Sequence, residues 1–179
     1  MSSSSASFSR CKKYRYTLSR TWDANLPQIM FVGLNPSTAD AEVDDPTVRR
    51  CVRFARDWGF GGLILTNLFA FRSTDPKRIK GVADPVGPEN DLVIRRACKS
   101  VDCVVVAWGV HGTLSNRDRE VLAMLESPQC LGVTNGGAPR HPLYLAARAR
   151  RRQFRTSSRA LATERADATV SLKARRRSA

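Results

Sequence analysis

Two asparagines and a histidine stand where short apolar segments of the sequence end or are interrupted. Asn35 follows the apolar run 28–33, and Asn67 interrupts the apolar run 63–71. An amide both donates and accepts hydrogen bonds, so Asn35 could orient a water molecule or a substrate, and Asn67 could recognise the edge of a flat base. His141 lies in a segment rich in glycine and proline. Its imidazole could stabilise a developing anion or act as an acid or base.

Each of these residues also has a purely structural interpretation. A buried amide needs a hydrogen-bond partner, and Asn67 could find it by tying down a neighbouring loop. His141 could be an exposed loop histidine. His111, two residues after Gly109, is a weaker candidate for the same chemistry. The sequence leaves these alternatives open.

Charged residues between positions 44 and 56 raise a similar choice. Asp44 and Asp45 precede Pro46, which is typical of a helix start with an acidic N-cap, although the pair could also bind a cation or act as a base. Four arginines follow at helical spacing and could contact phosphate or form a solvated face. They are Arg49, Arg50, Arg53 and Arg56.

The elements that must position these side chains alternate along the chain. Apolar runs predict strands over 28–33, 63–71, 102–109 and 129–134. Between them, helices are predicted from Asp44–Asp45 to about Ala55, over 89–99 and over 116–125. Strands that are apolar on both faces indicate a parallel sheet covered by helices. The sequence therefore predicts an α/β fold, a three-layer α/β/α sandwich with a mainly parallel four-stranded sheet. Ligands of such sheets bind beyond the carboxyl ends of the strands, where Asn35, Asn67 and His141 would meet.

The formal charge of +14 is carried by the two ends of the chain. Residues 1–20 sum to +5, residues 146–179 to +9, and residues 21–145 hold 14 basic and 14 acidic side chains. We expect a disordered basic leader over 1–13, one α/β domain over 14–145, and an Arg-rich tail over 146–179 that is disordered or partly helical. Basic ends could add nonspecific affinity for phosphate backbones.

Composition excludes several classes of protein. No apolar run approaches the roughly 18–20 residues that span a bilayer, so no membrane partner is expected. The first ten residues lack the apolar region of a secretory signal. Five scattered cysteines without a C-x-x-C pair fit reduced thiols in the cytoplasm, and two histidines are too few for a histidine-based metal centre. We therefore expect no metal and no cofactor.

Five short motifs in order resemble a bacterial family of unknown function. They are L-N-P-S-T-A-D at 34–40, D-D-P-T at 44–47, N-L-F-A-F-R at 67–72, A-W-G at 107–109 and H-P-L-Y-L at 141–145. More distantly, the chain resembles the uracil-DNA glycosylase superfamily. That resemblance is carried by G-L-N-P at 33–36, T-N at 66–67, Glu89, W-G at 108–109 and H-P at 141–142.

The second resemblance implies a fold and a set of roles. Asn35 would position the water that attacks the glycosidic carbon, Asn67 would bind the flipped base, and His141 would stabilise the charge on the departing base. Pro36 and Ser37 would complete the base-binding set. The expected nucleic-acid contacts are Arg49, Arg53, Arg140, Leu143 and Tyr144, with Leu143 or Tyr144 as a wedge.

The predicted function is hydrolysis of the N-glycosidic bond of a damaged or modified base, in DNA or in a nucleotide. The expected partner is accordingly nucleic acid or a nucleotide. Two alternatives stay open: a non-catalytic nucleic-acid-binding module, and an accessory protein of a phage or mobile element.

Overall fold

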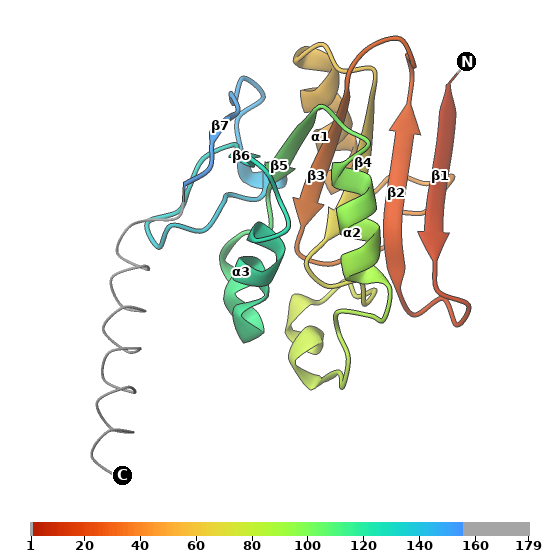
Figure 1. Cartoon of the computed structure of the whole chain (residues 1–179), viewed down its shortest axis with the longest axis vertical. Coiled ribbons are helices and arrows are strands. Elements are labelled where there is room, and N and C mark those ends of the chain that lie inside the picture. Colours follow the sequence, from red (N-terminus) through yellow and green to blue (C-terminus); the bar gives the residue numbers. More distant parts are fainter. Residues whose placement is uncertain (1, 156–179) are drawn as a thin grey trace.

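The computed structural model describes residues 2–155 and shows a twisted sheet with helices on both faces (Figure 1). The strands are β1 (Ser3–Phe8), β2 (Arg15–Thr21), β3 (Gln28–Gly33), β4 (Gly62–Asn67), β5 (Cys103–Val106), β6 (Gln129–Cys130) and β7 (Arg152–Gln153). The α-helices are α1 (Pro46–Asp57), α2 (Asn90–Cys98) and α3 (Arg117–Leu122). Shorter 3-10 turns cover Pro76–Gly81, Val110–Asn116 and Pro142–Tyr144.

The sheet is mixed and has seven strands, in the order β1-β2-β4-β3-β5-β6-β7. The four strands expected from the sequence are its centre and pair in parallel, β4 with β3, β3 with β5, and β5 with β6. The expectation of a four-stranded sheet is wrong, because β1, β2 and β7 add antiparallel strands at the two edges. The α/β class itself is confirmed.

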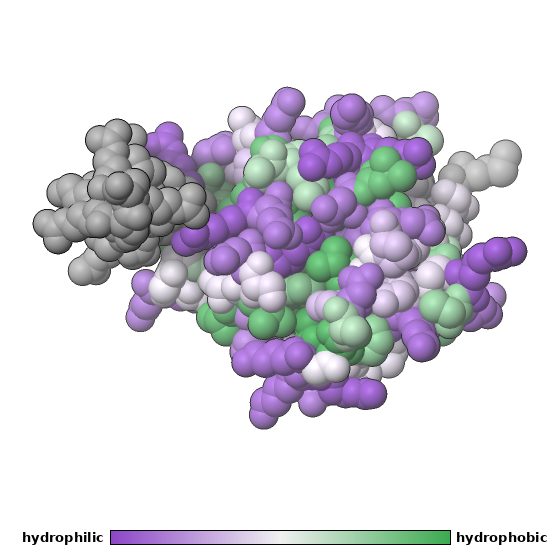
Figure 2. Space-filling view, turned by 60° about the horizontal axis from the view of Figure 1, so that its bottom comes forward, coloured by the Kyte–Doolittle hydropathy of each residue, from purple (hydrophilic) through white to green (hydrophobic). Residues whose placement is uncertain are grey.

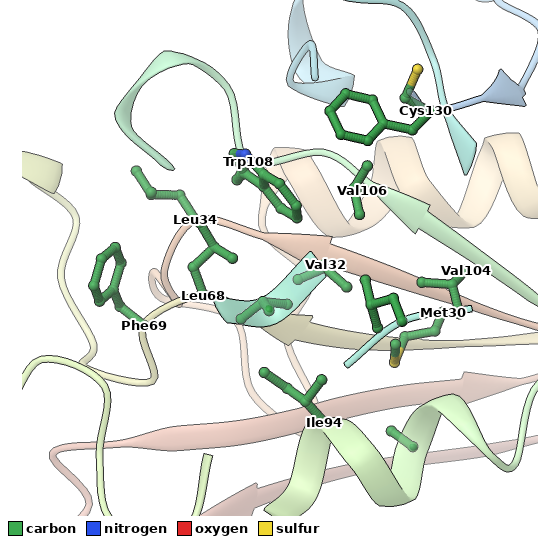
Figure 3. Close-up of a cluster of buried hydrophobic side chains, with 14 of the residues drawn as sticks. Met30, Val32, Leu34, Leu68, Phe69, Ile94, Val104, Val106, Trp108 and Cys130 are labelled. Carbon is green, nitrogen blue, oxygen red and sulfur yellow. The ribbon is translucent and has the colours of Figure 1, made fainter. Parts of the chain in front are cut away.

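Strand β3 shows how the sheet packs between its helices. Ile29 and Phe31 join a buried cluster with apolar residues of α1, whereas Met30 and Val32 join a second cluster with residues of α2 and α3. Figure 3 shows this second cluster, in which Ile94 of α2 lies over Met30 and Val32. Alternate residues of a strand point to opposite faces, so a strand that is apolar throughout must be covered on both sides.

Helix α1 begins as the sequence predicts. Asp45 has an extended backbone and its carboxylate accepts a hydrogen bond from the backbone N–H of Val48, at 2.9 Å. Pro46 occupies the first turn, where its missing N–H is not needed. Asp44 pairs with Arg20 at 2.7 Å. The helix-cap interpretation of this acidic pair is therefore confirmed for Asp45.

Both ends of the described chain are more ordered than the sequence predicts. The expected disordered leader instead contains β1, which pairs with β2 and is joined to it by a hydrogen bond between the Ser5 and Ser19 hydroxyls. The prediction failed because an exposed serine-rich edge strand has no hydrophobic pattern. Within the expected tail, β7 pairs with β6, and Phe154 packs edge-on against Trp108. The rest of the tail, 156–179, lies outside the described residues.

Three of the central strands, β4, β5 and β6, are shorter than predicted. Strand β4 ends at Asn67, so this residue is the last of its strand. The next two backbone N–H groups, of Leu68 and Phe69, donate to the carbonyls of Gly33 and Leu34. Strand β6 contains two residues, because the chain leaves the sheet at Gly132, whose φ of 140° favours glycine. None of the described helices is long and apolar enough to cross a membrane.

Candidate functional site

A cavity of about 570 Å³ lies at the carboxyl ends of β3 and β4 and beside the segments that follow β5 and β6. The first turn of α1 and the N-terminal residue of β2 complete its wall. Of the side chains singled out from the sequence, nine line this cavity: Asn35, Ser37, Asp45, Asn67, His111, Arg140, His141, Leu143 and Tyr144. Segments more than 100 residues apart in the chain therefore meet at one site.

The side chain of Asn35 is held in one orientation by the backbone. Its Nδ2 donates to the carbonyl oxygens of Pro36, at 3.0 Å, and Ser73, at 2.8 Å. Two carbonyl acceptors fix which end of the amide is nitrogen. Oδ1 is thus the atom of this side chain that is left to accept a hydrogen bond from a water or a ligand in the cavity.

Asn67 is buried, with 6% of its surface exposed, and its Nδ2 has no hydrogen-bond partner. Its backbone is fixed by the neighbouring elements. Asn90 of α2 donates through Nδ2 to the carbonyls of Asn67 and Leu68, both at 3.0 Å, and Arg117 donates to Leu68 at 2.9 Å. Buried amides without partners are uncommon in proteins, and Asn67 is one of the residues that line the cavity.

Gly33 makes room for the Asn67 amide. A β-carbon built on Gly33 would lie 2.7 Å from Oδ1 of Asn67, closer than real contacts allow. The glycine that ends β3 therefore lets the amide at the end of β4 lie against the neighbouring strand. In the sequence, this glycine signals only the end of an apolar run.

His141 is partly buried and lines the same cavity. Burial lowers its pKa, and the negative charge of Asp45 opposes this effect. Nδ1 accepts a hydrogen bond from the backbone N–H of Leu143, at 3.3 Å. In the neutral ring, which burial favours, the proton is then on Nε2. The cavity thus contains a neutral imidazole that can donate a hydrogen bond.

The cavity mouth carries exposed apolar side chains. Tyr144 is 83% exposed and its ring lies 5.6 Å from that of His141, while Leu143 and Val110 are also exposed. Figure 2 brings forward the end of the molecule at which β3 and β4 finish, and it shows hydrophobic residues in the middle of this face with hydrophilic residues around them. Exposed apolar residues gathered at a cavity are typical of a binding site.

Three residues expected at the site do not line the cavity. The ring of Pro36 is buried outside it, and only the Pro36 carbonyl takes part, as an acceptor for Asn35. Arg49 donates to the carbonyl of Asp44, and Arg53 lies 3.8 Å from Asp57 in an exposed ion pair. The structure does not bring these two arginines to the residues at the carboxyl ends of the strands.

One cavity residue was missed in the sequence. Arg15, the first residue of β2, lines the cavity and is 4% exposed. Site residues were expected only at the carboxyl ends of parallel strands. Because β2 is antiparallel to β4, the N-terminal end of β2 lies beside the carboxyl end of β4. A usable signal was present, since Arg15 is a charged residue inside the strand-like segment Tyr14–Leu18.

No group of three or more histidine, cysteine or acidic side chains within residues 2–155 is placed to hold a metal ion. Every one of the five cysteines is a free thiol, and none lines the cavity. The chemistry available at the site is that of two amides, the Asp45 carboxylate, the imidazoles of His111 and His141, hydroxyl groups and the guanidinium groups of Arg15 and Arg140.

Comparison with known proteins gave one match. A family model described as "Protein of unknown function (DUF1643)" matches residues 15–143, well over half of the chain. The motifs at 34–145 had led us to expect a family of unknown function, and at this level the expectation is confirmed. Neither the curated proteins nor the solved structures gave a match, so the resemblance to uracil-DNA glycosylases stays a prediction.

Proposed function

The chain belongs to DUF1643, a family of unknown function, and we propose that its cavity binds a nucleobase and hydrolyses the bond between that base and its sugar. The observation that carries the proposal is the cavity shared by Asn35, Asn67 and His141, in which the buried Nδ2 of Asn67 has no partner. A carbonyl on the edge of a base would supply the missing acceptor.

The three side chains can be assigned complementary roles in breaking an N-glycosidic bond. Asn35 accepts a hydrogen bond from a water through Oδ1 and directs its oxygen at the sugar carbon C1′. As the C1′–N bond breaks, the base leaves with the bonding electron pair, and the Nε2 proton of His141 stabilises the negative charge. The water supplies the new hydroxyl on C1′, and its other proton is the one that the departed base finally takes up.

A neutral histidine suits this role better than a charged one. The ring can donate from Nε2 while Nδ1 stays fixed by the Leu143 N–H. Because burial lowers the pKa of His141, the neutral form is available at neutral pH without competition from protonation. The cavity volume of about 570 Å³ lies in the range of pockets that bind small molecules of nucleotide size.

Base release from defined substrates tests the proposal. The pure protein is incubated with oligonucleotides that contain uracil, hypoxanthine or mismatches, and separately with the corresponding nucleotides, and free base is measured by chromatography. We expect Asn35→Ala to reduce release at least 100-fold in a variant that stays folded at the assay temperature, although the loss of its two Nδ2 bonds should lower the melting temperature. Asn25→Ala, which changes an exposed asparagine outside the cavity, is the control. Absence of release from every substrate would contradict a hydrolase.

The same assay distinguishes the proposed hydrolase from the alternative, a non-catalytic nucleic-acid-binding module. Its support is the excess of basic residues at the two ends of the sequence. This alternative predicts salt-dependent binding of DNA without base release, and binding that Asn35→Ala leaves unchanged.

A further inference from the structure

Arg15 is a buried cation without an acidic partner. It is 4% exposed, and within residues 2–155 the one hydrogen bond of its side chain runs from Nη1 to the carbonyl of Ala39, at 2.6 Å. Nε has no partner, and Arg15 takes part in none of the ion pairs found within residues 2–155. Burial lowers its pKa to about 10, so the guanidinium is still charged at neutral pH. Buried charges are normally paired.

The aspartates nearest to Arg15 make their hydrogen bonds and ion pairs with other residues. Asp45 accepts the N–H of Val48 as the cap of α1, Asp44 is paired with Arg20, and Asp40 accepts the N–H groups of Glu42 and Val43. The negative charges of Asp45 and Asp40 favour the charged form of Arg15, and the positive charges of Arg72 and Arg20 oppose it. Within residues 2–155 no acidic side chain forms an ion pair with Arg15, so its Nε is left for a ligand of the cavity that Arg15 lines.

Other groups around this part of the cavity suit an anion. Ser37 and Thr47 bring hydroxyl groups, and Thr47 and Val48 belong to the first turn of α1, where the helix dipole is positive. Arg15 is buried and lines the same cavity as Asn67. A phosphodiester of a long strand would run across the exposed mouth, whereas a terminal phosphate can enter the cavity with the nucleotide that carries it.

We propose that Arg15 binds the phosphate of a mononucleotide whose base contacts Asn67. The proposal rests on the proposed function for the nature of the base, and it selects free nucleotides over DNA as the substrate class. The planar guanidinium can donate to a phosphate from Nε and a terminal nitrogen together.

The test compares ligands that differ only in the phosphate. Deoxyuridine, deoxyinosine and their 5′-monophosphates are each titrated into the protein, and their affinities are compared by calorimetry. Binding of inorganic phosphate is measured as the shift in melting temperature relative to chloride at equal ionic strength. We expect the monophosphates to bind the wild type at least tenfold more tightly than the nucleosides. Arg15→Gln is expected to remove this difference. Arg96→Gln, which removes an exposed arginine of α2, is expected to preserve it.

Three results would overturn the inference. They are equal affinity of nucleoside and monophosphate for the wild type, full phosphate preference in a folded Arg15→Gln variant, and equally tight binding of a 5′-phosphorylated dinucleotide. If Arg15→Gln does not fold, the inference is still tested by the wild-type comparison and by Arg15→Lys. The lysine keeps the positive charge but lacks the planar guanidinium that can donate two hydrogen bonds to one phosphate. Nucleoside binding without a phosphate preference would leave the proposed function standing. Phosphate binding through Arg15 without any base binding would contradict both the proposed function and the identification of the ligand as a nucleotide, and would leave a phosphate site at Arg15.

Discussion

The buried Nδ2 of Asn67 has no hydrogen-bond partner, which opposes folding, and the proposed ligand would supply the missing acceptor. A buried amide without a partner destabilises a protein by about 1–3 kcal/mol. Asn67→Ala removes this donor, so we expect the free energy of unfolding to stay within about 1 kcal/mol of the wild type while binding of the nucleotide base falls at least tenfold. Denaturant unfolding and calorimetry measure the two effects.

Asn90→Ala is the comparison for this prediction, since Asn90 is also a buried asparagine and its Nδ2 donates to the carbonyls of Asn67 and Leu68, while its Oδ1 has no partner. It should lower the stability by about 1–3 kcal/mol. An Asn67→Ala variant that is as unstable as Asn90→Ala would mean that Asn67 holds the fold and does not serve a ligand.

His141 predicts a pH dependence whose sign follows from its lowered pKa. In the unfolded chain histidine takes up a proton near its ordinary value of 6.5, and the native side chain does so at lower pH. Below about pH 6.5 the unfolded state therefore binds more protons, and stability decreases as pH falls. His141→Gln removes this difference, so its denaturation midpoint should decline less between pH 7.5 and 5.5. His111→Gln, at an exposed histidine, should decline like the wild type; equal slopes for all three proteins would contradict the prediction.

At the scale of elements, the sequence was informative where strands are buried on both faces. The four central strands and all three α-helices were found from apolar runs, caps and turn residues, because burial on both sides leaves a continuous hydrophobic signal. Strands β1, β2 and β7 were missed, since each lies at or near an edge and alternates polar residues or is very short. Their partners are set by tertiary pairing, which no local pattern contains.

The residues of the site also divide into those that local sequence patterns predicted and those that depend on tertiary pairing. Asn35, Asn67 and His141 were predicted because the carboxyl ends of parallel strands converge. Arg15 could not be found by that rule, since it comes from the start of an antiparallel strand whose existence was not predicted. The role of Gly33 depends on a distance across two strands, so it too needed the structure.

Gly33→Ala tests how closely the ends of β3 and β4 must approach. The new β-carbon would lie 2.7 Å from Oδ1 of Asn67, and the amide must move out of its place. We expect nucleotide-base binding to fall at least tenfold, as in Asn67→Ala, and stability to fall by about 1–3 kcal/mol. Gly81→Ala is the control, because its β-carbon would meet nothing within 4 Å. Tight base binding by Gly33→Ala would show that the position of the amide is unimportant.

For the whole molecule, the charge is divided between a neutral middle and two basic ends. Residues 21–145 sum to zero and contain all the cavity residues except Arg15. The cavity and the excess charge therefore belong to different parts of the chain. Nonspecific attraction to nucleic acid and recognition of a small ligand are expected to be separable properties.

Neutralising the C-terminal end tests this separation. Residues 156–179 hold six basic side chains against two acidic ones. Replacing these six residues by glutamine keeps the length of the chain and should weaken binding of duplex DNA at low salt. Each lost phosphate contact should also reduce the magnitude of the slope of log affinity against log salt concentration by about 0.9. The slope is measured by fluorescence anisotropy between 50 and 200 mM salt, a range of about fourfold that resolves such a change. Mononucleotide binding should stay unchanged, since the cavity residues lie between Arg15 and Tyr144. A loss of mononucleotide binding together with DNA binding would mean that the C-terminal end serves the cavity directly.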